Sequence, residues 1–256
     1  MIHNLALIDP SAEIDEGVSI GPYSVIGPEV QIGKNTKIHS HVLVDGPTKI
    51  GEDNEIFQFA SVGGDPQDKK YQGEKTFLEI GNQNVIREGV TINRGTVQEK
   101  SLTKIGSNNL IMAYCHIAHD CEIHDEVVLV NNASLAGCVK IQTGAILGGF
   151  SLVHQFCKVG QYSFSAMGSS IGKDIPAFVR VSGNPAIPRG LNTTGIRRLN
   201  LKKEVSDNLK EAYKILYLRN FKLNDAVIEI SKKLSEISEV QILLDSISAS
   251  ERGIVR

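Results

Sequence analysis

A histidine beside a carboxylate is the arrangement in this sequence best suited to moving a proton. The segment His116-Ile-Ala-His119-Asp120 holds two histidines and one aspartate within a few residues. An imidazole oriented by a neighbouring carboxylate can act as a general base, because its pKa lies near neutrality. A nearby glycine would add a backbone N–H able to stabilise a developing oxyanion. We therefore expect His119 to be a base, with Asp120 orienting it.

The elements that must position these residues repeat every six residues. Isoleucine, leucine or valine recurs at this interval through 8–62, 80–92 and 105–171, with Ser165 as the single exception. One hexad supplies a short strand and a turn, and three hexads return the chain to the same face one layer further along. The pattern therefore predicts a mainly β fold, a left-handed parallel β-helix of hexapeptide repeats.

Stacking in such a β-helix gives the candidate base its neighbours. Residues 18 positions apart lie in adjacent layers, at the ordinary interstrand spacing of about 4.8 Å. His119 should therefore lie beside Gly137, and Gly137 beside Gln155, with Cys138 and His154 adjacent to them. This polar ladder predicts a site that joins a base, its orienting carboxylate and a backbone donor.

Two segments interrupt the six-residue repeat, and near the C-terminus the spacing of the apolar residues changes to that of a helix. The polar segments at about 63–79 and 94–104 have no hexad character, so we expect loops that project outward and serve function. Apolar residues at helical spacing follow the repeat. We expect a β-helix over 1–189 and a small C-terminal α-helical domain over 190–256.

Composition and charge exclude several classes of function. The 27 basic and 29 acidic residues give a net charge of −2, and tryptophan is absent, so we expect no nucleic-acid partner. No stretch approaches the roughly 18 apolar residues of a membrane span, and the N-terminus lacks signal-peptide features. We expect a cytoplasmic protein with no integral membrane segment and no cofactor.

The cysteines suit packing better than metal or redox chemistry. None forms a CxxC pair, and Cys115, Cys121 and Cys157 fall at the small inward position of their hexads. Only Cys138 should face outward, in the ladder. A zinc site is also disfavoured: His119 and His124 have the spacing of two ligands in gamma-class carbonic anhydrases, but the third ligand position, 83, is Gln. We therefore expect no metal.

Several strings are specific enough to suggest a family. Together they resemble the UDP-N-acetylglucosamine acyltransferases of lipid A biosynthesis, over essentially the whole chain. The strings are NEIFQFASVG (54–63), PQDKKY (66–71), TINRGTV (91–97), HIAHDC (116–121), NNASLAG (131–137), HQFCKVG (154–160), GNPA (183–186) and the final ERGIVR.

The resemblance implies a reaction and an assembly. The family transfers an (R)-3-hydroxyacyl chain from acyl carrier protein to the glucosamine 3-position of UDP-N-acetylglucosamine, the first step of lipid A biosynthesis. His119 would remove the proton of the sugar hydroxyl, Asp120 would orient the imidazole, and the Gly137 amide would bind the oxyanion. The family is homotrimeric, with active sites between subunits.

The resemblance also implies substrate contacts. Asn93 and Cys138 stand where many members have histidine, so an acceptor with a 3-hydroxyl and one with a 3-amine both remain open. Met167 lies where residue size limits the acyl groove, which favours a chain of about ten carbons. The substrate-binding positions are Gln67, Asp68, Lys70, Asn93, His116, Cys138, His154, Gln155, Asn192 and Arg198.

A cluster of basic residues and two rival interpretations complete the expectations. The basic run comprises Arg189, Arg197, Arg198, Lys202 and Lys203, and it suits the docking of an acidic carrier protein. The sister N-acyltransferase of the same pathway is one rival, although it normally carries an extra N-terminal domain. A non-catalytic β-helix scaffold is the other.

Overall fold

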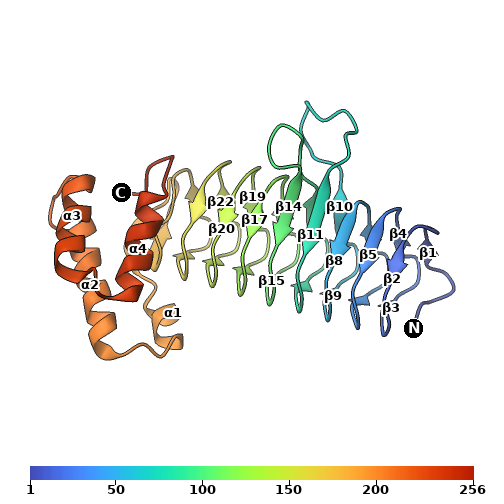
Figure 1. Ribbon diagram of the computed structural model, residues 1–256, viewed down its shortest axis with the longest axis horizontal. Helices are drawn as coiled ribbons and strands as arrows, with labels where there is room; N and C mark the ends of the chain where they lie inside the picture. The colour runs from blue at the N-terminus through green and yellow to red at the C-terminus, as the bar shows by residue number, and fades with distance from the viewer.

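The structure is a computed structural model that describes all 256 residues. Its strands form three sheets, I to III, of nine, eight and ten strands. The strands are short because each hexad spends most of its residues on the turn. The chain belongs to the left-handed β-helix class, and Figure 1 shows the β-helix as an elongated body with helices at one end.

Strands that follow one another along a sheet lie a full coil apart in the sequence. Sheet I contains β1 (Leu7–Ile8), β4 (Val25–Ile26), β7 (Leu43–Val44), β10 (Ser61–Gly64), β13 (Thr91–Asn93), β16 (His116–Ile117), β19 (Ser134–Leu135), β22 (Leu152–Val153) and β25 (Ser170–Ile171). Sheet II contains β2 (Glu13–Ile14), β5 (Val30–Ile32), β8 (Thr48–Ile50), β11 (Phe77–Ile80), β14 (Leu102–Ile105), β17 (Glu122–Ile123), β20 (Lys140–Ile141) and β23 (Lys158–Val159). Sheet III contains β3 (Ser19–Ile20), β6 (Lys37–Ile38), β9 (Glu55–Ile56), β12 (Val85–Ile86), β15 (Leu110–Ile111), β18 (Val128–Leu129), β21 (Ile146–Leu147), β24 (Phe164–Ser165), β26 (Val179–Ser182) and β27 (Ile187–Leu191).

The register confirms the predicted stacking. Leu7 pairs with Val25, and His116 pairs with Ser134, each 18 residues on in a parallel ladder. The aliphatic track faces inward: Ile111 and Leu129, for example, are fully buried. Burial on this scale explains why a chain with two-residue strands can hold a single fold, since the apolar area removed from water grows with every coil.

Two loops interrupt the coils without breaking the sheets. Ser61 pairs with Thr91 and Phe77 pairs with Leu102, so these layers are longer than 18 residues while their strands stay in register. The extra residues project together from one edge of the β-helix (Figure 1). The loops span 65–76 and 94–101, shorter than expected from the sequence, because the flanking strands continue the ladders to their neighbours.

The C-terminal part begins with an unexpected pairing. β26 continues sheet III in parallel, and β27 then returns antiparallel to β26. Four helices follow, and the last three pack against one another: α1 (Thr193–Arg198), α2 (Lys203–Tyr217), α3 (Leu223–Leu234) and α4 (Ser238–Ser248). None of these helices combines the length and the apolar character needed to cross a bilayer.

The final residues tie the helices to the last coils. The buried Asp174 carboxylate accepts hydrogen bonds from the Lys158 backbone N–H at 2.7 Å and the Ser250 hydroxyl at 2.6 Å. Val255 and Ile254 are buried beside Asp174. These contacts fix the helices to the end of the β-helix, where an uncovered last coil would expose strand edges.

Candidate active site

His119 and Asp120 lie in the turn between β16 and β17, where their side chains meet. Asp120 has a φ of 58°, the left-handed conformation that aspartate tolerates better than most residues. Nδ1 of His119 lies 2.8 Å from Oδ2 of Asp120. An ionised carboxylate only accepts, so Nδ1 carries the proton and Nε2 remains the basic nitrogen. The pair therefore has the geometry of a base held by its orienting group.

The 94–101 loop closes over the Asp120 carboxylate. The Thr96 backbone N–H and hydroxyl donate to Oδ2 at 3.0 and 2.7 Å, and the Lys100 N–H donates to Oδ1 at 3.1 Å. The Asp120 N–H in turn donates to the Thr103 hydroxyl at 2.8 Å. The carboxylate is 1% exposed, so these donors replace the water it has lost.

The electrostatics of the pair favour a charged imidazolium beside a carboxylate. The hydrogen bond to Asp120 raises the pKa of His119 above its ordinary 6.5; burial opposes this, and the charges of Asp68 and Glu99 add to the rise. Burial pushes the pKa of Asp120 upward, but its hydrogen bonds outweigh burial, and the pKa is lowered. His119 can therefore accept and hold a proton next to a permanent negative charge.

The imidazole of His119 lies over Gly137 of the next coil. A Cβ added to Gly137 would be 2.5 Å from Cε1 and 2.6 Å from Nε2 of the ring, which no real side chain tolerates. The Gly137 N–H makes no hydrogen bond within the chain. The stacking predicted from the sequence thus places a free backbone donor beside the basic nitrogen.

Cys138 lies in the predicted ladder as a half-buried, protonated thiol. It is half-buried in a left-handed turn with a φ of 63°. Burial, together with Glu99 and Asp120, raises its pKa to about 12. Its sulfur lies within 4.8 Å of ligand atoms of His119 and Asp120. Because Asp120 already accepts four hydrogen bonds and the thiol holds its proton, the cluster suits proton transfer better than metal binding.

The other three cysteines are buried, as expected for packing. Burial raises the pKa of Cys115 and Cys157 to about 11, and that of Cys121 to about 12.

His116 stands near the pair, whereas the two residues predicted one coil further on are exposed. Nδ1 of His116 lies 2.7 Å from the Thr91 hydroxyl, and burial together with His119 lowers the pKa of His116. His154 and Gln155 both face solvent, and Nδ1 of His154 bonds only the Gln155 carbonyl, at 3.1 Å. His116 is therefore a neutral donor or acceptor beside the site.

Two of the three residues predicted on the first loop are exposed. Gln67 and Lys70 are exposed, and Asp68 is half-buried, with its carboxylate accepting the Lys70 N–H at 2.9 Å. The negative charge of Asp68 contributes to the raised pKa of His119.

Asn93 is buried at the base of that loop. Its Nδ2 donates to the Asp65 carbonyl at 2.8 Å, and its Oδ1 has no partner. The adjacent Arg94 side chain binds the Gly63 carbonyl and the Asp65 carboxylate. Both residues therefore anchor the 65–76 loop to sheet I.

Three predicted residues lie toward the C-terminal end, away from the dyad. Asn192 caps α1 by accepting from the Gly195 N–H at 3.0 Å, and it donates to the Tyr162 carbonyl at 2.9 Å. With Arg198 it lines a cleft of about 300 Å³ at β26 and β27. Met167 is 79% exposed. One chain thus gathers His116, the dyad and its ladder, but leaves these three apart.

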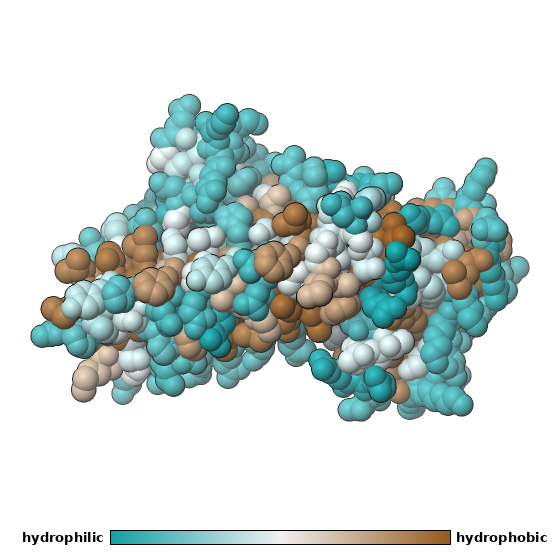
Figure 2. Space-filling model, turned by 180° about the vertical axis from the view of Figure 1, so that it is seen from behind, coloured by the Kyte–Doolittle hydropathy of each residue, from teal (hydrophilic) through white to brown (hydrophobic).

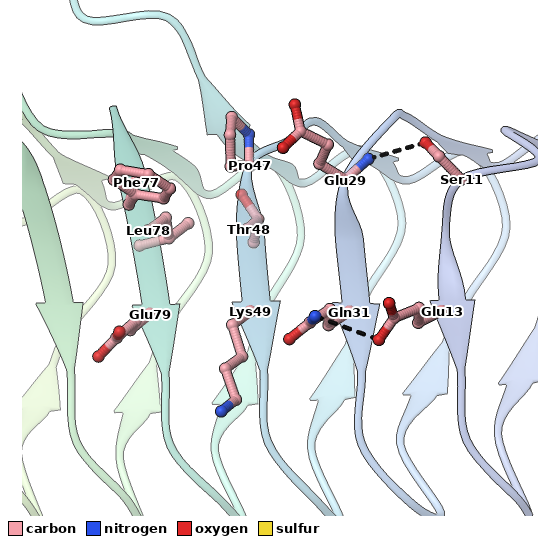
Figure 3. A pocket seen from close by; sticks show the side chains of 10 residues that line it. All are labelled: Ser11, Glu13, Glu29, Gln31, Pro47, Thr48, Lys49, Phe77, Leu78 and Glu79. Carbon is pink, nitrogen blue, oxygen red and sulfur yellow. Dashed lines mark hydrogen bonds between the residues drawn. The ribbon is translucent and has the colours of Figure 1, made fainter. Parts of the chain in front are cut away.

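Another hollow lies on the outer face of sheet II, several coils before the dyad. It measures about 350 Å³, and hydrogen bonds join Glu13 to Gln31 and Glu29 to Ser11 along its floor (Figure 3). It contains none of the residues predicted to act, so we do not assign it to the reaction.

Comparison with known proteins identifies the family. One family model, described as Udp N-acetylglucosamine O-acyltransferase, Domain 2, matches 174–255, and another, described as bacterial transferase hexapeptide (six repeats), matches 2–46 and 102–137. A relative from Stutzerimonas stutzeri, named as an acyl-carrier-protein–UDP-N-acetylglucosamine O-acyltransferase, is 53% identical over 100% of this chain and 99% of its own. The chain belongs to the UDP-N-acetylglucosamine O-acyltransferase family.

Solved structures of UDP-N-acetylglucosamine O-acyltransferases share the architecture. LpxA from Acinetobacter baumannii is 52% identical and matches with a TM-score of 0.97 over 100% of this chain and 99% of its own. The acyltransferase from Arabidopsis matches at 35% identity with a TM-score of 0.89, over the full length of both chains. The chain is thus an enzyme of this acyltransferase family along its whole length.

The residues that hold Asp120 were not predicted from the sequence. In this O-acyltransferase chain Thr96 and Lys100 reach the carboxylate from a loop that has left the hexad register, so adding 18 to a residue number could not locate them. Thr103 lies in the regular strand β14 and accepts the Asp120 backbone N–H, and it was not predicted either. Thr96 does lie within the family string TINRGTV (91–97), but the string alone does not show what its hydroxyl binds.

Proposed function

We propose that this chain transfers an (R)-3-hydroxyacyl group from acyl carrier protein to the glucosamine 3-position of UDP-N-acetylglucosamine. Relatives that match 98 to 100% of this chain are named acyl-carrier-protein–UDP-N-acetylglucosamine O-acyltransferases, which supports transfer of an acyl group to an oxygen of this sugar nucleotide. The observation that carries the proposal is the His119–Asp120 pair, with the free N–H of Gly137 beside the imidazole. A base with an oxyanion donor beside it is what acyl transfer to a hydroxyl needs.

The geometry suggests the order of events. Nε2 of His119 takes the proton of the sugar 3-hydroxyl while the oxygen attacks the thioester carbonyl, forming the C–O bond. The carbonyl oxygen becomes an oxyanion that accepts a hydrogen bond from the Gly137 N–H. The C–S bond then breaks, and the thiolate of the carrier's prosthetic group recovers the proton from the imidazolium. Asp120 stays ionised throughout and stabilises the imidazolium.

The acceptor sugar could carry either a hydroxyl or an amine at its 3-position. Asn93 and Cys138 stand at the two positions where many members have histidine, and a protonated thiol is a weaker hydrogen-bond partner than an imidazole. Neither residue is the base, so the same proton transfer serves a hydroxyl or an amine. We favour the hydroxyl, because the matched relatives are named O-acyltransferases.

An acyl-transfer assay tests the proposal. The native protein is incubated with 3-hydroxydecanoyl-acyl carrier protein and, separately, UDP-N-acetylglucosamine, its 3-amino analogue and its 3-O-acylated form, and products are read by mass. Acylation of UDP-N-acetylglucosamine is the expected result. Failure with all three acceptors would leave the fold standing and remove the proposed activity.

We also infer that the chain works as a homotrimer with its sites between subunits. Apolar side chains gather in rows along the β-helix on the face shown in Figure 2. The strands carry partly or fully exposed apolar residues, among them Leu7, Val25, Leu43 and Leu152 on sheet I, and Val85, Leu110, Val128, Ile146 and Phe164 on sheet III. Rows of this kind on a protein surface favour burial against another copy. A solution mass of three chains by light scattering is expected, and a monomer would contradict the inference.

The basic cluster is the proposed docking site for acyl carrier protein. All five side chains are exposed, and none joins any salt bridge of the chain: Arg189, Arg197, Arg198, Lys202 and Lys203. Unpaired cations at one end of the molecule attract an acidic partner.

Charge reversal should weaken that docking. The double change Lys202→Glu and Lys203→Glu is expected to raise the KM for acyl carrier protein about tenfold with little change in kcat. Acidic residues at the start of α2 suit the helix dipole, so the fold should persist. The matched control reverses the charge of Lys222, which directly precedes α3, and of Lys232, which lies within α3. A native KM for acyl carrier protein in the Lys202→Glu and Lys203→Glu variant would contradict the docking site.

Met167 is the proposed limit on acyl length. Its side chain is exposed in the single chain, where a neighbouring subunit or an acyl chain can cover it. Met167→Gly should shift preference toward longer donors by about fourfold per added methylene, because each buried methylene is worth about 0.8 kcal/mol. Competition between ten- and twelve-carbon donors measures the shift, and an unchanged ratio would mean that Met167 only packs.

A further inference from the structure

The 94–101 loop surrounds the carboxylate that orients the proposed base. Thr96 gives two hydrogen bonds to Asp120, from its N–H and its hydroxyl, and the Lys100 N–H gives a third. The hydroxyl bond, at 2.7 Å, and the bond from His119, at 2.8 Å, end on the same oxygen, Oδ2. A displacement of that oxygen therefore changes both bonds together.

Burial and backbone hydrogen bonds of the loop restrain Thr96. Its side chain is buried, with the residue 1% exposed. Its carbonyl accepts the N–H groups of Glu99 at 3.1 Å and Ser101 at 2.9 Å, which closes the loop on this residue. On the preceding side, Gly95 donates its N–H to the Phe77 carbonyl at 3.1 Å. The donor hydroxyl is thus fixed to the β-helix through backbone bonds.

A carboxylate with both oxygens bonded has lost its freedom to rotate. The Asp120 backbone lies in a left-handed turn, and its side chain is nearly inaccessible, so water cannot replace a missing donor easily. The bond to Nδ1 fixes the tautomer and the plane of the imidazole, and therefore the direction of Nε2. We propose that Thr96 is a positioning residue, which through Asp120 aims the His119 imidazole at the acceptor hydroxyl.

The proposal rests on the proposed function and adds to it a residue that touches neither substrate nor reacting atoms. The test compares Thr96→Val, which removes the hydroxyl, with Thr96→Ser, which keeps it. A valine methyl needs more room than 2.7 Å from Oδ2, so the carboxylate shifts and its bond to His119 weakens. We expect kcat to fall about 10- to 100-fold in Thr96→Val with little change in KM, and to recover in Thr96→Ser.

Thr76→Val is the matched control. Thr76 is also fully buried beside a loop, but its hydroxyl has no hydrogen-bond partner. Its loss should leave kcat unchanged. An equal loss of activity in both valine variants would overturn the proposal, because it would point to loop stability alone.

The decisive measurement is the pKa of His119, obtained from an NMR titration of its imidazole ring. The charged and titratable groups around the imidazole are Asp120, Asp68, Glu99 and His116, with the protonated thiol of Cys138. Thr96→Val removes none of these groups, and it alters only the contacts of the Asp120 carboxylate, including the hydrogen bond that the carboxylate accepts from His119. We therefore expect the pKa of His119 to fall in Thr96→Val and to stay native in Thr96→Ser. An unchanged pKa in Thr96→Val would overturn the proposal.

A second variant covers failure of Thr96→Val to fold. Lys100→Pro removes one of the two backbone donors to Oδ1, the other being the Thr96 N–H, while Lys100→Ala keeps both and controls for the lost side-chain pair with Glu122. The pKa of His119 should fall in the proline variant alone. The NMR readout needs no activity: an inactive native protein in which Thr96→Val lowers this pKa would refute the proposed function and keep the positioning role.

Discussion

Alanine in place of His119 is expected to lower the kcat of acyl transfer by about 10²-fold or more, with little change in the KM of either substrate. The reason is that the neighbouring groups are poorer bases: burial lowers the pKa of His116, and the Cys138 thiol holds its own proton. A loss of this size is typical when a positioned general base is removed. Initial rates with 3-hydroxydecanoyl-acyl carrier protein measure it.

The dependence of kcat/KM on pH also tests whether His119 is the base. A base must be neutral to act, and the pKa of His119 is raised above 6.5 by Asp120. The kcat/KM of the native enzyme should therefore rise with pH through a midpoint above 6.5 and level off where the imidazole is neutral.

His124→Ala is the matched control for this variant. His124 lies on the same part of the β-helix but faces solvent, 3.4 Å from Glu122. It should keep the native rate. An alanine variant of His119 that retains more than about a tenth of native activity would contradict the assignment of the base.

The fold was predictable because its information is periodic. Every inward position recurs after six residues, so a substitution of one aliphatic residue for another does not hide the pattern, and stacking by 18 places His119 over Gly137 from residue numbers alone. The antiparallel return of β27 was not predictable, since the segment after Ile171 follows no period. Its direction follows from the short turn over 183–186, because a connection this short joins antiparallel strands.

The candidate site divides in the same way. Residues in the ladder, such as Gly137 and Cys138, follow from arithmetic on the sequence. The hydrogen bond from the Thr96 hydroxyl to the Asp120 carboxylate cannot be predicted in this way, because its geometry depends on how an irregular loop folds. Asn93 and Asn192 show a further limit: both were expected from resemblance to bind substrate, and in the folded chain both also satisfy backbone groups, which no motif reveals.

Gly137→Ala is expected to lower kcat about 10²-fold while the protein remains folded. The new Cβ would lie 2.5 Å from the His119 ring, so the imidazole must turn away from the acceptor hydroxyl, and a misplacement of about 1 Å is enough for a loss of this order. The Gly137 backbone has no positive φ, so alanine brings no backbone strain of its own. The partly exposed imidazole can swing outward, which limits the cost to stability.

Gly172→Ala separates this clash from a general effect of alanine. Gly172 also lies in a β-helix turn without a positive φ, but a Cβ there would meet nothing within 4 Å. This control should keep native kcat and thermal midpoint. Because Gly137→Ala keeps the backbone N–H, its loss of rate reports the displaced ring, and the pKa of His119 should fall as the ring leaves Asp120. Native activity in Gly137→Ala would mean that the imidazole acts from another orientation.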